Sequence, residues 1–180
     1  MLFDDLAQFK TGGFPPHYPA NVRRFYSPQD QVHQAIKALL NSATVSLYIS
    51  MYGEDDPELT SIIVQKAGDA NIFVQINLDK TQAGGSAEVP LVKQLEGCPS
   101  TRVAVGMSAA HKINHLKMAV VDELYSLSGS TNWSADGESK QNNEASIHMD
   151  AAIAGEAIRV LSIEHQVMLQ QMAACAVKPA

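Results

Sequence analysis

The hydrophobic positions of this 180-residue chain follow two periodicities. Continuous β-prone runs at residues 45–52 and 72–78 predict strands that are buried on both faces. Elsewhere apolar side chains recur at helical spacing, which predicts amphipathic helices. The expected helices cover residues 28–40, 57–66, 89–95 and 151–173, and the other expected strands cover residues 22–26, 102–105, 115–122, 125–130 and 144–148.

Strands and helices alternate in the first half of the chain. This alternation favours parallel pairing, because parallel strands need crossover helices between them. The second half is rich in strands joined by short turns, which favours antiparallel pairing. We therefore predict an α/β fold with a mixed parallel/antiparallel β-sheet flanked by helices on both faces.

Local signals suggest where the helices start and where the domain lies. Ser27 and Pro28 predict an N-cap and a first helical residue, and Asp56-Pro57 predicts the start of a second helix. Residues 11–20 are rich in Gly and Pro, which indicates an extended segment. We expect an N-terminal arm over residues 1–20, a single domain over residues 21–175 and a short tail over residues 176–180.

The charge of the chain excludes a strongly basic coat. Thirteen Lys and Arg against nineteen Asp and Glu give a formal charge of −6, so unselective nucleic-acid binding through net charge is not expected. The two cysteines, Cys98 and Cys175, exclude a disulfide framework and a four-cysteine zinc site. A single disulfide bond between these two cysteines remains an alternative.

The sequence contains no apolar run near the roughly 18 residues of a membrane span. Asp4 and Asp5 stand where a secretory signal carries basic residues. We therefore expect a cytoplasmic protein without stable membrane insertion. An exported parent with a trimmed leader stays open.

The candidate chemistry gathers between residues 114 and 150. His115 and Lys117 would share one face of a strand, as would Ser130 and Asn132 if their strand continues that far. A neutral imidazole is a competent nucleophile toward phosphorus, and a lysine beside it supplies charge for the phosphate oxygens. Glu144 supplies a carboxylate that can hold the second imidazole nitrogen. These residue types indicate phosphodiester transfer.

The spacing His115-x-Lys117-x4-Asp122-x6-Gly129-Ser130-x-Asn132 resembles the HKD signature of the phospholipase D superfamily. The chain carries one copy of the signature, as in the small bacterial endonucleases of that superfamily. The resemblance implies a phospholipase D-like α-β-α sandwich and a homodimer whose active site lies at the two-fold interface.

The resemblance also implies roles for the residues of the signature. His115 of one subunit would form a phosphohistidine, and His115 of the other would protonate the leaving oxygen and then activate water. Lys117 and Asn132 would hold the phosphate, with Ser130 as a further hydrogen-bond donor, and Glu144 would orient an imidazole. Asp122 and Gly129 would be structural.

Four further residues are candidates for the substrate groove: His111, Lys112, Lys80 and Trp133. Solvated loops are the alternative for the three basic side chains, and packing beneath the signature is the alternative to base stacking for Trp133. His111 and His115 are four residues apart, but the sequence HKINH lacks the Glu that follows the first His of a zincin. We predict no metal and no cofactor.

Three functions compete for this sequence. The first is a metal-independent, low-specificity endonuclease, and it is favoured by the small size and the single motif. The second is a phospholipase D or transphosphatidylase acting on phospholipid, and it is weakened by the missing second motif and membrane anchor. The third is a non-catalytic nucleic-acid-binding scaffold, and it is weakened by the filled catalytic positions. We expect a nucleic acid substrate, with DNA favoured over RNA.

Overall fold

The structure is a computed structural model that describes residues 3–83 and 88–176, and within them it forms one seven-stranded sheet. The strands are β1 (Val22–Ser27), β2 (Ser46–Met51), β3 (Phe73–Asp79), β4 (Thr101–Gly106), β5 (Lys117–Val121), β6 (Tyr125–Gly129) and β7 (Asn143–Met149). They lie in the order β1-β7-β6-β5-β2-β3-β4. Strands β2, β3 and β4 pair in parallel, and all other neighbours are antiparallel. The predicted mixed sheet is confirmed.

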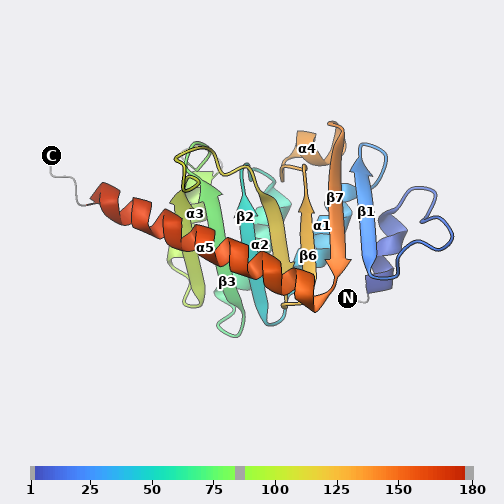
Figure 1. Ribbon diagram of the computed structural model, residues 1–180, viewed down its shortest axis with the longest axis horizontal. Coiled ribbons are helices and arrows are strands. Elements are labelled where there is room, and N and C mark those ends of the chain that lie inside the picture. The colour runs from blue at the N-terminus through green and yellow to red at the C-terminus, as the bar shows by residue number, and fades with distance from the viewer. Residues whose placement is uncertain (1–2, 84–87, 177–180) are drawn as a thin grey trace.

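Helices cover both faces of the sheet. The helices α1 (Val32–Asn41), α2 (Pro57–Gly68) and α3 (Glu88–Glu96) lie behind it in Figure 1, and the long α5 (Ala151–Ala176) crosses the front face diagonally. In β2, Leu47 and Ile49 join the core on the side of α1 and α2, whereas Tyr48 packs with Val120 and Leu161 on the side of α5. This two-sided burial explains why the run at residues 45–52 is apolar without alternation.

Helix α5 is long but polar at intervals. It has 26 residues, which include Glu156, Arg159 and Glu164. Among the residues that the structure describes, no helix combines the length and the apolar character that crossing a membrane requires.

The first long helix begins later than expected. Helix α1 starts at Val32 rather than at residue 28, and Gln31 takes the N-cap place that we assigned to Ser27. Ser27 instead ends β1, where its single hydroxyl proton is shared between the carbonyl oxygens of Gly137 (3.0 Å) and Gln141 (2.7 Å). The cap prediction is wrong because this hydroxyl is committed to a segment far away in the sequence.

The second helix begins as expected. The carboxylate of Asp56 accepts hydrogen bonds from the backbone N–H groups of Glu58 and Leu59, both at 2.9 Å. This bonding satisfies two of the N–H groups that the first turn of α2 leaves without helical partners.

The N-terminal residues pack against the domain. A short 3-10 helix, η1 (Phe3–Phe9), buries Phe3 and Leu6 in the main core. Further along, Lys10 forms an ion pair with Asp30 at 2.7 Å. These contacts fold the segment that we expected as an arm back onto the sheet, while the domain limits at residues 20/21 and 175/176 stay predictions.

Asp122 fastens the turn between β5 and β6 to the start of β2. Its carboxylate accepts hydrogen bonds from the N–H groups of Thr44, Val45 and Ser46 and from the hydroxyl of Thr44. Burial alone would raise the pKa of Asp122, but these hydrogen bonds outweigh it and hold the pKa below its usual value. The geometry supports the structural role that the resemblance implies.

Candidate active site

His115 and Lys117 lie together at the edge of the sheet where β2 ends and β5 begins. Strand β5 starts at Lys117, so His115 sits on the loop before it. The ring of Tyr52, the residue after β2, meets the His115 imidazole edge-on with centroids 4.9 Å apart. The same ring lies 5.0 Å from Nζ of Lys117, which donates a hydrogen bond to the carbonyl oxygen of His115 at 2.9 Å. Tyr52 therefore holds both side chains in one place.

The two side chains differ in their access to solvent. His115 is exposed, whereas Lys117 is only 5% exposed. Burial lowers the pKa of Lys117, and the nearby Asp79 carboxylate opposes part of that effect. A partly desolvated ammonium group attracts a phosphate more strongly than one in bulk water, because the local dielectric constant is lower.

Buried polar contacts anchor the loop that carries His115. The backbone N–H of Asn114 donates to the Asp79 carboxylate, and its side-chain amide donates to Oγ of Ser50 at 2.8 Å. Ser50 in turn donates to Oε2 of Glu164 on α5 at 2.7 Å, and Asn77 donates to the same oxygen at 2.9 Å. Burial raises the pKa of Glu164, and these two hydrogen bonds partly oppose it. The place of His115 thus depends on α5, far away in the sequence.

The same network includes a histidine for which the sequence offered no partner. His165 is buried, and its Nδ1 lies 2.7 Å from Oδ1 of Asn77. Burial, helped by Arg102, lowers the pKa of His165. We missed this network in the sequence, although Ser50 and Asn77 signal it: both are polar residues inside otherwise apolar strands.

Asn132 lies beyond the end of β6, not on a continued strand. Its side chain packs over Gly53, where an added Cβ would lie 3.8 Å from Cγ of Asn132. Its Oδ1 is buried without a hydrogen-bond partner from the residues described. Because Gly53 follows Tyr52, the side chain of Asn132 packs against the same loop that places Tyr52.

Trp133 is an anchor and not part of a groove. It is 1% exposed, its backbone N–H donates to the carbonyl oxygen of Gly53, and its own carbonyl oxygen accepts from the N–H groups of Asp55 and Asp56. Stacking on a base is excluded by this burial. The residue ties the signature to the β2–α2 loop instead.

Ser130 and Glu144 form a second group, toward β1. Oγ of Ser130 donates to Oδ1 of Asn143 at 2.9 Å and accepts from the N–H of Glu144 at 3.0 Å. The Glu144 carboxylate pairs with Arg24 at 3.3 Å, and no hydrogen bond within the described part of the chain joins it to His115. Arg24 was not among our candidates. Orientation of an imidazole by Glu144 therefore stays a proposal that needs a second subunit.

Gly129 permits the close approach of β6 and β7 that builds this group. A Cβ at residue 129 would lie 2.0 Å from the carbonyl oxygen of Glu144. No side chain fits there, so the glycine of the signature has a steric reason.

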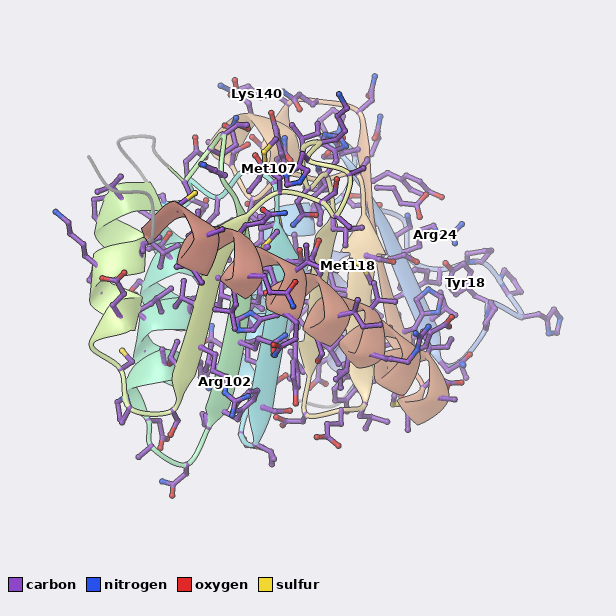
Figure 2. The ribbon with its side chains drawn as sticks, turned by 60° about the vertical axis from the view of Figure 1, so that its left-hand side comes forward. Tyr18, Arg24, Arg102, Met107, Met118 and Lys140 are labelled. Atoms are coloured by element: carbon purple, nitrogen blue, oxygen red, sulfur yellow. The ribbon has the colours of Figure 1, made fainter. Side chains whose placement is uncertain are left out.

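The remaining groove candidates lie on loops at the same end of the sheet. Lys80, His111 and Lys112 are all exposed, and none of them forms an ion pair among the residues described. Figure 2 shows Met107 and Lys140 at this end and Arg102 at the other. Gln171 on α5 holds the loop: its side chain accepts from the N–H of Met107 at 2.8 Å. Residues 84 and 85, the glycine pair, lie outside the described residues.

The side chains placed to share a metal ion, among those described, are His33, Asp56 and Glu138 rather than His111 and His115. Burial raises the pKa of Glu138 to about 7, against the opposing hydrogen bond to His33. For His33, burial alone would lower the pKa, but the hydrogen bonds to Glu138 and Glu58 outweigh it and raise the pKa.

Known proteins resemble this chain over most of its length. Residues 36–163 match the family described as "Cardiolipin synthase, PLD-like domain". A phospholipase D from Rickettsia bellii is 23% identical over an alignment of 161 positions, which covers 84% of this chain and 77% of that protein. The fold matches Nuc from Salmonella typhimurium, a phospholipase D family member, with a TM-score of 0.69 and 20% identity over 79% of this chain and 92% of that one.

NucT from Helicobacter pylori has the same fold, with a TM-score of 0.70 and 22% identity over 83% of this chain and 95% of that one. The α-β-α sandwich that the signature implied is thus confirmed. With the family match over residues 36–163 and one HKD signature on the edge of the sheet, this chain belongs to the phospholipase D superfamily.

Proposed function

We propose that this protein is a metal-independent endonuclease of low sequence specificity. Membership in the superfamily already supports phosphodiester hydrolysis or transfer. The observation that carries the proposal is the exposed imidazole of His115 held next to the partly desolvated ammonium of Lys117. A nucleophile and a phosphate-binding cation are then available without a metal ion.

In the proposed reaction, the imidazole of His115 attacks phosphorus and the bond from phosphorus to the leaving oxygen breaks. His115 of the partner subunit donates a proton to that oxygen. The same partner imidazole then takes a proton from water, and the water oxygen displaces His115 from phosphorus. Lys117 and the side-chain N–H of Asn132 stabilise charge on the non-bridging oxygens.

The mouth of the site favours nucleic acid over phospholipid. In the described parts of the loops that border His115, the large apolar side chains are Met107 and Ile113, and the exposed charged groups include Lys80 and Lys112. A polynucleotide continues on both sides of the scissile phosphate and needs a hydrated groove with backbone, hydroxyl and lysine contacts. A phospholipid needs an apolar entry for its tails. We expect binding to weaken steeply as salt rises.

A shared site in a homodimer follows from the single signature. The mechanism needs two histidines, and one chain supplies one His115. The Glu144 carboxylate forms its ion pair with Arg24 and no hydrogen bond with His115 of its own chain, among the residues described. It is therefore available to the partner's imidazole.

Mixed dimers test the shared site. If subunits exchange, a roughly ninefold excess of His115→Asn chains should reduce wild-type activity to about one tenth, because mixed dimers lack one histidine. His17→Asn chains are the control, since His17 is exposed and lies outside the signature. Activity that is unaffected by His115→Asn chains after exchange would show that each chain works alone.

The substrate class is tested by direct incubation. Purified protein is mixed, in EDTA and low salt, with plasmid, single-stranded DNA, RNA and phosphatidylcholine vesicles, with His115→Asn as the control. We expect cleavage of nucleic acid by the wild type alone. Turnover of vesicles without cleavage of any nucleic acid would establish the phospholipase instead.

A further inference from the structure

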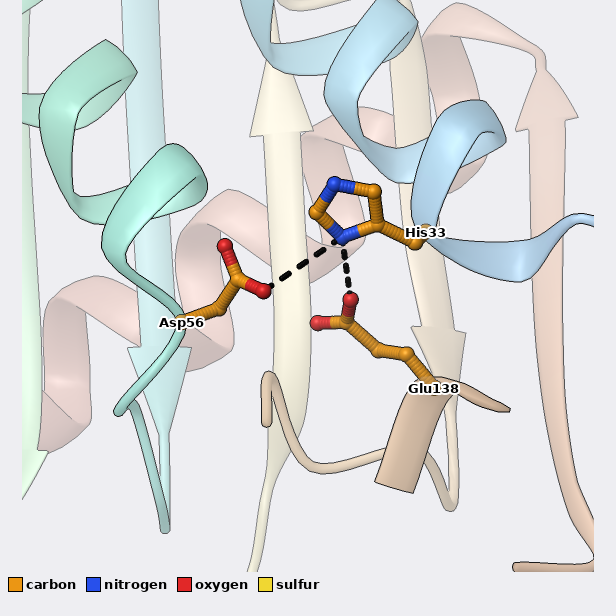
Figure 3. Close-up of side chains that lie close together, drawn as sticks. All are labelled: His33, Asp56 and Glu138. Carbon is orange, nitrogen blue, oxygen red and sulfur yellow. Dashed lines mark hydrogen bonds and ion pairs between the residues drawn. The ribbon is translucent and has the colours of Figure 1, made fainter. Parts of the chain in front are cut away.

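His33, Asp56 and Glu138 meet between three helices. His33 lies in the first turn of α1, Asp56 caps α2, and Glu138 lies on the short α4 (Ala135–Ser139), as Figure 3 shows. Nδ1 of His33 shares a hydrogen bond with Oε2 of Glu138 and lies 3.5 Å from Oδ2 of Asp56. One ligand atom from each residue lies within 4.8 Å of the other two.

Asp56 and His33 each have two polar side-chain atoms, and one of the two is already hydrogen-bonded outside the cluster. The other atom of each side chain therefore points toward the shared position. Oδ1 of Asp56 accepts the two N–H groups of the α2 N-terminus, so Oδ2 is left to face His33. Nε2 of His33 lies 3.3 Å from Oε2 of Glu58. A histidine that donates its Nε2–H to a carboxylate presents the lone pair of Nδ1, which is the arrangement found behind metal-bound histidines.

The polar atoms of this cluster are not all satisfied. Glu138 is 2% exposed and its Oε1 is buried without a hydrogen-bond partner among the described residues. Asp56 is 8% exposed, and Lys37, one turn along α1 from His33, is paired with Glu58. One imidazole thus faces two buried carboxylates. A buried polar atom without a partner is costly, and a cation at this point would offset that cost.

We propose that His33, Asp56 and Glu138 bind a divalent transition-metal cation, with Zn²⁺ as the best fit. One nitrogen and two carboxylate oxygens form a ligand set that zinc accepts at about 2.0–2.2 Å in a tetrahedral arrangement. Ligand atoms in such a site lie roughly 3.4 Å apart, close to the separation of His33 and Asp56, and the contact between His33 and Glu138 would open by under about 1 Å. The His33 side chain is 23% exposed, which leaves a path for the ion and for a water as fourth ligand.

The metal would join α4 to α1 and α2 and would take no part in the phosphodiester chemistry. Asp56 donates its N–H to the carbonyl oxygen of Trp133, and a Cβ on Gly137, the neighbour of Glu138, would lie 2.5 Å from the carbonyl oxygen of Asn132. The cation would therefore steady the segment that carries Asn132. Its loss should lower thermal stability without abolishing cleavage.

Titration of ZnCl₂ into chelator-treated protein tests this site. We expect one Zn²⁺ per wild-type chain and an increase in Tm on binding. Glu138→Gln keeps the shape of the side chain but removes an anionic ligand, and His33→Gln removes the nitrogen. Each should weaken zinc binding at least about tenfold. His17→Asn and Glu156→Gln change an exposed histidine and an exposed acid and should bind zinc as the wild type does.

X-ray absorption of the wild-type zinc complex gives a second readout that does not depend on any variant. We expect nitrogen and oxygen ligands with a single histidine. The proposal would be overturned if the wild type did not bind zinc stoichiometrically, or if both site variants bound zinc as tightly as the wild type. A zinc site with sulfur or several histidines as ligands would also overturn it.

Discussion

The ring of Tyr52 packs edge-on against the imidazole of His115, with centroids 4.9 Å apart. Lys117 lies over the same ring, so one residue at the end of β2 sets the relation between nucleophile and cation. This contact does not depend on the Tyr52 hydroxyl, which accepts a hydrogen bond from Gln82.

Two substitutions of Tyr52 should therefore distinguish the role of its ring from the role of its hydroxyl. Tyr52→Phe keeps the ring and should change kcat by no more than about threefold, whereas Tyr52→Leu should lower kcat by about tenfold or more, because the imidazole loses its support. Steady-state kinetics on DNA measure both variants. Equal effects of the two substitutions would contradict the positioning role of the ring.

The buried network beneath His115 predicts a kinetic effect at Asn114. Asn114→Ala removes the hydrogen bond to Ser50 and should lower kcat by about tenfold with little change in KM, since it misplaces the nucleophile. Gln75→Ala is the control: Gln75 is also buried and polar, but its side-chain amide donates a long hydrogen bond, 3.4 Å, to the carbonyl oxygen of Leu161 and not to Asn114 or Ser50. It should lower Tm and leave kcat unchanged. A loss of stability alone in Asn114→Ala would reject the positioning role.

Substitution by alanine should change the thermal stability in opposite directions at two glycines. Gly129→Ala places a methyl group against the Glu144 carbonyl and should cost about 3 kcal/mol, which is roughly 6–12 °C in Tm. Gly155 lies in α5 with open space around it, so Gly155→Ala should raise Tm by about 2 °C through higher helix propensity. The Tm of each variant is measured by thermal unfolding, monitored by circular dichroism. If both substitutions shifted the Tm by a similar amount, the close approach of β6 and β7 at Gly129 would be contradicted.

Asp122 predicts a pH-dependent contribution to stability. Its pKa is lower in the folded protein than the unfolded value of about 3.9, so its stabilisation is present above that pH and is lost as the pH falls through the folded pKa. Asp122→Asn removes the charge and replaces one of the two accepting oxygens by an NH₂ group, so part of the hydrogen bonding from Thr44, Val45 and Ser46 is lost. We expect a Tm about 4–8 °C below wild type at pH 7 and a smaller difference near pH 3.

Glu123→Gln is the control for this measurement. Glu123 is exposed in the same turn, and its loss should change Tm by less than about 2 °C. A difference between wild type and Asp122→Asn that stays constant from pH 7 to pH 3 would show that the carboxylate charge does not matter.

The parts of the fold that follow from local signals were predictable from the sequence. The apolar runs of β2 and β3 mark strands covered on both faces, and Asp56-Pro57 marks a helix start, because its cap bonds lie within three residues. The HKD spacing identified the residues that meet around Tyr52. These features depend on neighbours along the chain, which a sequence displays directly.

The parts that depend on distant partners were not predictable. Ser27 looks like a cap, but its hydroxyl is used by Gly137 and Gln141. Glu144 pairs with Arg24 across two strands, and His33 meets Glu138 more than one hundred residues later in the chain. A single sequence contains no signal for such pairings, since each residue type also occurs on solvated loops.

The most direct test of the central claim is to trap the intermediate on His115. Wild-type protein is mixed with DNA in EDTA, quenched rapidly at alkaline pH, digested and analysed by mass spectrometry. Our account predicts that a nucleotide is attached through its phosphate to His115 in the peptide that contains this residue. The adduct should form without metal and be absent from His115→Asn. DNA cleavage that proceeds without this adduct, or only after a metal ion is added, would contradict it.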